Sequence, residues 1–265
     1  MLEITSSSNP MIKMIKGLYR RKERRTRKLF LIEGIKMIGE CLDNDYPMES
    51  IIYCDGLLDM RGGEELFERI RDDRRLFKVS NRIYEEISDM ETPQGILGIA
   101  RFESNSTTDI EIGDNPFILL LDRVQDPGNM GAIIRTSDAF GIDGIIVTNG
   151  CVDTYNPKVV RATMGSIFRV PIYGVQNEIE LINMFKDEGM ALYVTALEGS
   201  MDIREVNFIR SCMLVIGNES SGVSRGIMEL ADNRVKIPMS GGAESLNVAV
   251  ASSIIMYEGM RQRVQ

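Results

Sequence analysis

The second half of the chain alternates continuous apolar segments with segments of helical spacing, and this alternation restricts the fold more than any other feature. Strands are expected over residues 117–121, 144–148, 169–173, 191–195, 213–216 and 234–237, and helices over 130–140, 158–164, 179–188 and 246–262. Strands without a polar face, separated by helices, are typical of a parallel sheet that helices cover on both sides. Ligands of such sheets bind beyond the carboxyl ends of the strands, so the residues that follow the strands are the candidates for a functional site.

The first hundred residues predict a smaller α/β unit. The expected helices begin at residue 10 and span 35–42, 64–72 and 82–89, and the expected strands span 29–32, 51–54, 77–79 and 96–102. The polar stretch 103–115 holds few large apolar residues, which is typical of an interdomain linker. We therefore predict two domains, residues 1–107 and residues 108–265.

Composition excludes several classes of protein. The chain contains no histidine, so Ser-His-Asp and Cys-His catalysis and H-E-x-x-H zinc sites are excluded. The cysteines, Cys41, Cys54, Cys151 and Cys212, form no C-x-x-C pair, and we expect free thiols and no bound metal. No apolar run reaches the roughly 18 residues of a membrane span, and the N-terminus has no apolar stretch that could act as a secretion signal. The expected location is the cytoplasm, without a membrane partner.

Positive charge is concentrated in one segment of an otherwise acidic chain. The formal net charge is −8, yet residues 11–28 carry nine basic side chains against Glu23 alone. The basic residues are Lys13, Lys16, Arg20, Arg21, Lys22, Arg24, Arg25, Arg27 and Lys28. An apolar stripe at helical spacing beneath these charges predicts one basic helix, which we expect to bind the phosphates of a nucleic acid. The alternative is a solvated helix face.

Three segments that follow expected strands carry glycines and polar side chains. The first segment, residues 121–135, leads from a strand through a turn rich in Gly and Pro into a helix, with Asn129 near the helix start and Arg135 nearly two turns later. Glycines at a helix N-terminus let polar or anionic ligands approach the backbone N–H groups. Taken alone, this segment also fits a well-capped surface helix.

The other two segments are glycine-bearing loops. The second segment, residues 214–224, leads an apolar strand into a polar loop bounded by Gly217 and Gly222. Its spacing imitates a phosphate-binding P-loop, but Val223 stands where that motif requires lysine, so a P-loop is excluded. The third segment, residues 237–251, joins a glycine loop to a helix of small residues, which Ser245 or Asn247 can cap. Taken alone, the second segment also fits a plain turn without a function. The third segment also fits a loop that leads into a tightly packed helix.

Together the three segments closely resemble the signature motifs of the SpoU (TrmH) family of RNA ribose 2′-O-methyltransferases, within the SPOUT superfamily. The resemblance covers residues 117–262, and residues 1–102 more loosely resemble the substrate-binding domain that often precedes it. Further matching pieces are the runs 156–162 and 168–171 with Gly165, and, near the N-terminus, the basic segment and the runs 30–34 and 92–95. Residues 150–153 have no functional match, and we assign them no function.

The resemblance implies a methyltransferase domain with a parallel α/β sheet and a deep trefoil knot, preceded by a small α/β RNA-binding domain. It also implies S-adenosylmethionine as the cofactor and a homodimer with the last helix in its interface. Catalytic roles are implied for Asn129, Arg135, Glu219, Ser245 and Asn247. Cofactor contacts are implied for Thr195, Ala196, Leu197, Ile216, Gly217, Asn218, Glu219, Ile237, Met239, Leu246 and Asn247. The expected RNA-binding residues are the nine basic residues named above and Arg161.

Methyl transfer from a sulfonium to a ribose hydroxyl needs precise placement, charge stabilisation and an acceptor for the hydroxyl proton. A guanidinium hardly ever deprotonates, so Arg135 is expected to stabilise charge and to hold a phosphate or a ribose. The neighbouring RNA phosphate and Glu219 are the candidate proton acceptors. Asn129 and Asn247 are expected to hold the loops in place.

The sequence thus predicts an enzyme that methylates a ribose 2′-hydroxyl of RNA, with ribosomal RNA as the leading substrate. Two alternatives stay open: a transfer-RNA enzyme of the same type, and a non-catalytic RNA-binding or ribosome-assembly factor. A Rossmann dehydrogenase is disfavoured because no G-x-G-x-x-G follows any expected strand.

Overall fold

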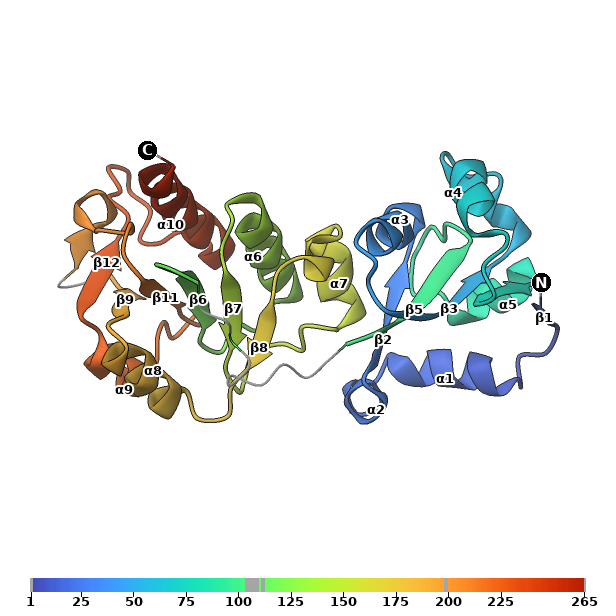
Figure 1. Ribbon diagram of the computed structural model, residues 1–265, viewed down its shortest axis with the longest axis horizontal. Helices are drawn as coiled ribbons and strands as arrows, with labels where there is room; N and C mark the ends of the chain where they lie inside the picture. Colours follow the sequence, from blue (N-terminus) through green and yellow to red (C-terminus); the bar gives the residue numbers. More distant parts are fainter. Residues whose placement is uncertain (1, 103–109, 111–112, 198–199, 265) are drawn as a thin grey trace. The chain divides into compact units, whose positions relative to one another are not determined.

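The computed structural model describes residues 2–102, 110, 113–197 and 200–264, and the chain forms two compact units (Figure 1). The first unit consists of Met1–Glu103 and Tyr155–Phe168, and the second of Ser104–Thr154 and Arg169–Gln265. The predicted boundary between residues 107 and 108 lies outside the described residues. The packing of residues 155–168 with the first unit was not predicted.

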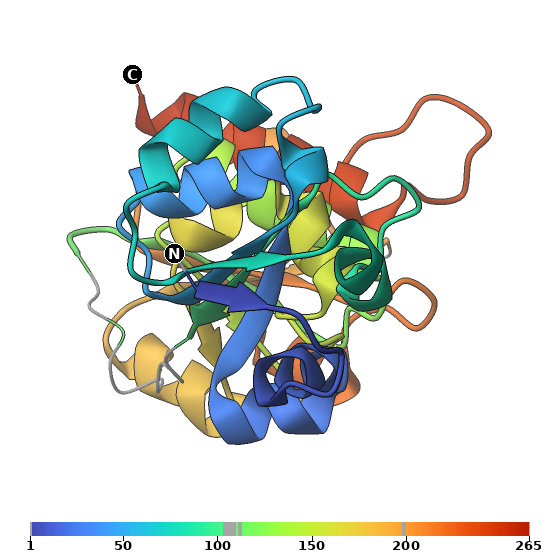
Figure 2. The same ribbon diagram turned by 90° about the vertical axis from the view of Figure 1, so that its right-hand side faces the viewer.

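The first unit is built on a mixed five-stranded sheet in the order β1-β4-β3-β5-β2. Its strands are β1 (Leu2–Ile4), β2 (Leu29–Glu33), β3 (Met48–Tyr53), β4 (Leu76–Val79) and β5 (Ile96–Arg101). Its helices are α1 (Pro10–Leu18), α2 (Arg21–Arg27), α3 (Ile35–Asp43), α4 (Gly63–Ile70), α5 (Asn81–Ile87) and α7 (Pro157–Thr163), with the short turns η1 (Asp55–Leu57) and η3 (Ser166–Phe168). β5 runs antiparallel to β2 and β3, and Figure 2 shows β1, in dark blue, at the edge of the sheet.

Aromatic contacts explain why residues 155–168 belong to the first unit. The ring of Tyr155 stacks on Phe102 with centroids 4.0 Å apart and lies 4.8 Å from the ring of Phe30. The ring of Phe168 lies 5.0 Å from that of Tyr46. Because these rings are far apart in the sequence, no local pattern predicts their contact.

The basic segment forms two helices, so the prediction of a single helix is wrong. Asn9 caps α1 by accepting a hydrogen bond from the backbone N–H of Met11 at 2.8 Å. At the other end of α1, the guanidinium of Arg24 folds inward and donates to the carbonyls of Leu18 and Tyr19 at 2.7 and 2.9 Å. A helix end leaves such carbonyls without partners inside the helix, and Arg24 satisfies two of them.

The second unit has an all-parallel seven-stranded sheet in the order β10-β12-β9-β11-β6-β7-β8, which confirms the predicted parallel α/β fold. Its strands are β6 (Phe117–Leu121), β7 (Gly144–Val147), β8 (Ile172–Gly174), β9 (Ala191–Thr195), β10 (Met201–Asp202), β11 (Cys212–Ile216) and β12 (Asn233–Lys236). Its helices are α6 (Pro127–Ala139), α8 (Glu178–Asp187), α9 (Arg225–Leu230) and α10 (Val248–Arg263), with the short turn η4 (Ile203–Glu205). The last helix starts two residues later than predicted, because Asn247 caps it from outside.

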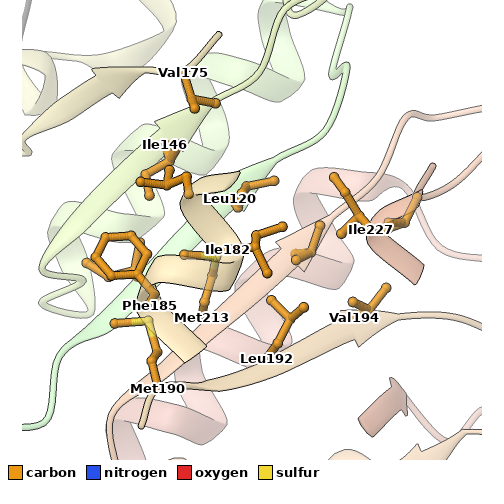
Figure 3. Packing of buried hydrophobic residues seen from close by; sticks show 14 of the residues in the cluster. Leu120, Ile146, Val175, Ile182, Phe185, Met190, Leu192, Val194, Met213 and Ile227 are labelled. Carbon is orange, nitrogen blue, oxygen red and sulfur yellow. The ribbon is translucent and has the colours of Figure 1, made fainter. Parts of the chain in front are cut away.

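The central strands of this sheet are buried on both faces, which positions the loops at their ends. Leu120 of β6 packs in a cluster with Ile182 and Phe185 of α8 (Figure 3). On the other face, α10 comes so close to β6 that a Cβ on Gly259 would lie 2.2 Å from Phe117 Cε1. The trefoil knot stays a prediction.

Two negative findings apply to the described ranges. None of their helices combines the length and the apolar character that crossing a membrane requires. No cluster of three or more Cys, Asp or Glu side chains in the same ranges could hold a metal ion.

Candidate active site

The loops after β9, β11 and β12 and the start of α10 enclose a cavity of about 580 Å³, a size typical of cofactor and small-ligand sites. The predicted site residues on its wall are Thr195, Ala196, Leu197, Gly217, Asn218, Glu219, Ile237, Met239, Ser245 and Leu246. The second and third segments therefore meet at one cavity, at the carboxyl edge of the sheet. The exposed loop between β12 and α10, orange-red in Figure 2, projects from its unit.

Four predicted site residues lie off this wall. Ile216 is buried in β11 and is absent from the wall, and its carbonyl accepts from the backbone N–H of Asp122 at 2.8 Å, so its cofactor contact stays a prediction. Asn247 stands next to the wall, at the start of α10, and Asn129 and Arg135 belong to α6.

The wall also contains residues that the sequence analysis missed. They are Ser220, Ser221, Gly222, Val223, Met228, Val235, Lys236, Val248, Ala251 and Ile255. Val248, Ala251 and Ile255 follow one another at spacings of three and four residues, and this helical spacing could have identified them. Lys236 and Glu219 supply the charge of the wall as far as the structure describes it.

A hydrogen-bond network joins the three segments beside the cavity. The side-chain amide of Asn129 donates to Glu219 Oε1 at 3.1 Å, and that of Asn247 donates to Asn129 Oδ1 at 3.0 Å. The backbone N–H groups of Gln125 and Asp126 donate to the same carboxylate at 3.2 and 3.0 Å. The first segment, which does not line the cavity itself, is thus connected to it through Glu219.

The Glu219 carboxylate is held in its charged form. Burial acts to raise the pKa of Glu219, but hydrogen bonds from Asp126, Asn129 and Gln125 outweigh burial and hold the pKa below its ordinary value. The group is therefore ionised at neutral pH, with donors on both of its oxygens. Such a carboxylate is a poor proton acceptor, and its geometry favours a role in orienting Asn129.

Asn218 is engaged in a similar way. Its Nδ2 donates to the carbonyl of Arg123 at 2.8 Å, and its Oδ1 accepts from the backbone N–H groups of Ser220 and Ser221 at 3.0 and 3.1 Å. The polar atoms of Asn218 therefore stabilise the loop, and the residue contributes mainly van der Waals surface to the wall of the cavity.

Arg135 lies on the exposed side of α6. It follows Asn129 by six residues, which corresponds to about 9 Å along a helix axis. Within the described parts of the chain, Arg135 forms neither an ion pair nor a hydrogen bond. Its guanidinium is free to bind a substrate.

The predicted RNA-binding residues lie in the first unit. Those with exposed side chains are Lys13, Lys16, Arg20, Arg21, Lys22, Arg25, Arg27 and Lys28. Arg24 is only 2% exposed and binds the carbonyls at the end of α1, so we remove it from the RNA-binding set. Arg161 is partly buried and pairs with Asp89 at 3.5 Å.

Comparisons with known sequences agree with this geometry. Residues 116–257 match the SpoU rRNA Methylase family, and residues 9–98 match the MRM3-like substrate binding domain. The chain is 33% identical to the 23S rRNA (guanosine(2553)-2′-O)-methyltransferase RlmP of Bacillus subtilis (strain 168), over 97% of this chain and 98% of that relative. It is 30% identical to the 23S rRNA (uridine(2479)-2′-O)-methyltransferase of Streptomyces viridochromogenes, over 98% and 92% of the two chains.

Solved structures give the same result. The AdoMet-bound rRNA methyltransferase from Sinorhizobium meliloti matches with a TM-score of 0.85 and 32% identity, over 98% of this chain and 97% of that one. The SpoU methyltransferase AviRb from Streptomyces viridochromogenes, in complex with AdoMet, matches with a TM-score of 0.85 and 28% identity, over 97% of this chain and 99% of that one. Fold, motifs and relatives agree over nearly the whole length of the chain. The chain belongs to the SpoU rRNA methylase family.

Proposed function

We propose that this protein transfers the methyl group of S-adenosylmethionine to a ribose 2′-hydroxyl of ribosomal RNA. The two relatives named above are 23S rRNA 2′-O-methyltransferases, and the two similar solved structures hold AdoMet. The observation that carries the proposal is the network of Glu219, Asn129 and Asn247 beside a cavity of about 580 Å³. A ribosomal RNA substrate also makes the cytoplasm the proposed place of action.

The residues of the cavity fit S-adenosylmethionine, which combines a flat purine, a ribose and a charged amino-acid part. Leu197, Met239 and Leu246 present large, partly exposed apolar side chains on the wall, and such surface suits a purine ring. Lys236 places a positive charge on the same wall, where it would pair with the carboxylate of the ligand. When bound, the cofactor supplies an electrophilic methyl group on a sulfonium.

The side chains of the site position the substrate and stabilise charge. Methyl transfer would join the ribose hydroxyl oxygen to the methyl carbon in place of the sulfur, so the hydroxyl proton would have to leave. Arg135, with its free guanidinium, stabilises the developing oxyanion and binds the neighbouring phosphate. Because Glu219 already accepts donors on both oxygens, we assign the proton to the adjacent RNA phosphate, from which it passes to water.

The exposed basic residues of α1 and α2 are the proposed contact with the RNA backbone. Lysine and arginine side chains attract phosphates irrespective of the base sequence. The net charge of the whole chain is −8, so this attraction depends on the local concentration of basic residues. Selection of the target nucleotide then rests on other parts of the protein.

We also propose a homodimer formed through α6 and α10. A hollow of about 390 Å³ is lined by Ala132, Phe140, Ala249, Val250, Ser253, Ile254 and Tyr257. Val250 and Tyr257 leave 49% and 50% of their surface exposed, although both are apolar or aromatic. A contiguous patch of this kind is typical of a subunit interface. Light scattering is expected to give twice the 29.8 kDa of one chain.

One experiment separates this proposal from the two alternatives. Ribose methylation is mapped across all ribosomal and transfer RNA from a strain that lacks the gene, and from the same strain carrying the wild-type gene or its Arg135→Ala variant. The proposal expects a ribosomal RNA methylation that disappears and that only the wild-type gene restores. Loss confined to transfer RNA would favour the transfer-RNA enzyme. An unchanged methylation pattern, with no AdoMet binding by the purified protein, would favour the non-catalytic factor.

A further inference from the structure

Arg123 adopts a backbone conformation that a residue with a side chain rarely takes, with φ at 59°. It directly follows the buried Asp122, and its Nε and Nη2 donate to the two carboxylate oxygens of Asp122 at 2.9 and 3.2 Å. Nη2 also donates to the carbonyl of Gly222 at 3.2 Å, and Asp122 accepts from the backbone N–H of Ser224 at 2.6 Å. An unfavourable backbone conformation persists only where its surroundings hold it, and here the ion pair with the buried Asp122 does so.

Arg123 is bonded to both ends of the loop 217–222. Its guanidinium reaches the carbonyl of Gly222, and its own carbonyl accepts from Asn218 Nδ2 at 2.8 Å. Asn218 and Gly222 also exchange two backbone hydrogen bonds, of 3.1 and 3.0 Å. These two backbone hydrogen bonds close the base of the loop that carries Glu219, and Arg123 braces the same base from outside the loop.

Arg123 and its neighbour Leu121 also contact Thr148 and the adjoining segment 150–153, to which no function was assigned from the sequence. Thr148 Oγ1 accepts from the backbone N–H of Arg123 at 3.2 Å, and the Cys151 thiol donates to the carbonyl of Leu121 at 3.2 Å. Gly150 has a φ of 98°, and a Cβ there would lie 3.0 Å from Arg123 Cγ. The glycine thus leaves space for the aliphatic part of the arginine side chain.

We infer that Arg123 is a positioning residue, which holds the loop 217–222 in its cofactor-binding conformation before the cofactor arrives. The inference rests on the proposed function, in which S-adenosylmethionine occupies this cavity. A loop that is already ordered loses less conformational freedom when a ligand binds, so the affinity is higher. Residues 148–152 then act indirectly, by supporting Arg123.

The test compares two arginine-to-asparagine variants. Asparagine tolerates a positive φ better than most residues, so Arg123→Asn removes the guanidinium and keeps the backbone conformation. Arg225→Asn is the matched control, because Arg225 lies just beyond the loop and pairs with Glu229 of its own helix at 2.7 Å. Calorimetry with S-adenosylmethionine is expected to show a Kd about tenfold higher for Arg123→Asn, equivalent to about 1.4 kcal/mol. The Kd of Arg225→Asn should stay within about twofold of the wild-type value, which is less than about 0.5 kcal/mol.

A second measurement separates positioning from a general loss of stability. The guanidinium of Arg123 is partly exposed, so millimolar methylguanidinium should enter the vacated place and restore part of the affinity of Arg123→Asn. A purely structural role would instead lower the melting temperature and the fraction of protein able to bind, leave the Kd of that fraction unchanged, and show no rescue. If Arg123→Asn does not fold, Arg123→Lys replaces it, since lysine keeps the charge without the two-point geometry.

The outcomes distinguish the inference from the function on which it rests. If the wild-type protein binds no S-adenosylmethionine, the proposed function itself is wrong. If the wild type binds and Arg123→Asn binds equally well, only the role of Arg123 is wrong. Equal losses in the Arg123 and Arg225 variants would trace the effect to surface charge and would also overturn the inference.

Discussion

Replacing Gly217 by alanine tests whether the loop 217–222 forms the wall of the cofactor cavity. A Cβ at this position would lie 2.3 Å from the carbonyl carbon of Gly222 and 2.3 Å from the backbone nitrogen of Val223. Both neighbours are backbone atoms, so no side-chain rotation relieves the overlap. An ordinary contact distance of about 3.5 Å requires the two sides of the loop to separate by roughly 1 Å.

The cost of this separation follows from two contributions. Overpacking of a tight site costs about 1–3 kcal/mol. The separation also stretches the two backbone hydrogen bonds between Asn218 and Gly222, now 3.1 and 3.0 Å long, and the loss of one costs about 0.5–1.5 kcal/mol. A total of about 1.5–4.5 kcal/mol, where it falls on the cofactor-binding conformation, corresponds to a rise of roughly tenfold or more in the Kd for S-adenosylmethionine, because about 1.4 kcal/mol is a factor of ten.

Calorimetric titration of the wild type, Gly217→Ala and Gly226→Ala measures this effect. Gly226 serves as the control, because an added Cβ would make ordinary contact with Ile179 Cδ1 at 3.5 Å, and its variant should bind the cofactor normally. Thermal unfolding of the same proteins shows how much of the cost falls on global stability. An unchanged Kd and an unchanged melting temperature for Gly217→Ala would refute the steric argument.

Three further predictions concern the other parts of the site. Arg135→Ala should abolish methylation and leave the Kd for S-adenosylmethionine within a few-fold, since Arg135 lies off the cavity wall; matched losses in the methylation assay and in calorimetry would mean that its role is structural. Reversing the charges of Arg21, Arg25 and Arg27 should weaken RNA binding. It should also reduce the steepness with which the logarithm of the binding constant falls with the logarithm of salt concentration, by roughly 0.7–0.9 per lost phosphate contact. A fluorescence titration with an unchanged slope would exclude these helices from the RNA interface. The pKa of Glu219 is lowered on folding, so the ionised carboxylate stabilises the loop. This stabilisation is complete above the ordinary pKa of 4.5 and is lost as the pH falls through the lower folded-state pKa. Glu219→Gln should remove this acid-side loss of cofactor binding, and a variant with the same pH profile as the wild type would contradict the assignment.

Element types in the second unit could be predicted because its strands are apolar on both faces. β6 and β9 occupy Phe117–Leu121 and Ala191–Thr195, the bounds expected from the sequence. β8 is shifted from the expected 169–173 to Ile172–Gly174, since Pro171 has no N–H for the ladder and Arg169 turns aside to pair with Asp138 at 2.8 Å. Strand existence depends on local composition, whereas strand ends depend on neighbouring strands.

The short elements β10 and α9 were not predicted. β10 has two residues and pairs with β12, and α9 has six residues and packs on the cluster below the sheet through Ile227. Segments this short are unstable alone and exist because tertiary neighbours complete them. The burial of Arg24 likewise depends on tertiary structure. The basic residues on both sides of Arg24 predict an exposed side chain, but its guanidinium is buried because it donates to a carbonyl at the end of α1.

The amino-acid sequence by itself determined the parallel α/β fold of the second unit, the concentration of positive charge near the N-terminus, and the set of polar residues at the strand ends. The tertiary structure decided which of these residues meet. Glu219 and Asn129 are 90 residues apart, and they form a hydrogen bond because β6 and β11 are neighbours in the sheet. It also decided that Glu219 is a charged acceptor with its oxygens engaged and that Arg123 braces the loop beside it. Local periodicity depends on residues a few positions apart, whereas hydrogen-bond partners and pKa values depend on strand order and on the paths of the loops, which periodicity does not contain.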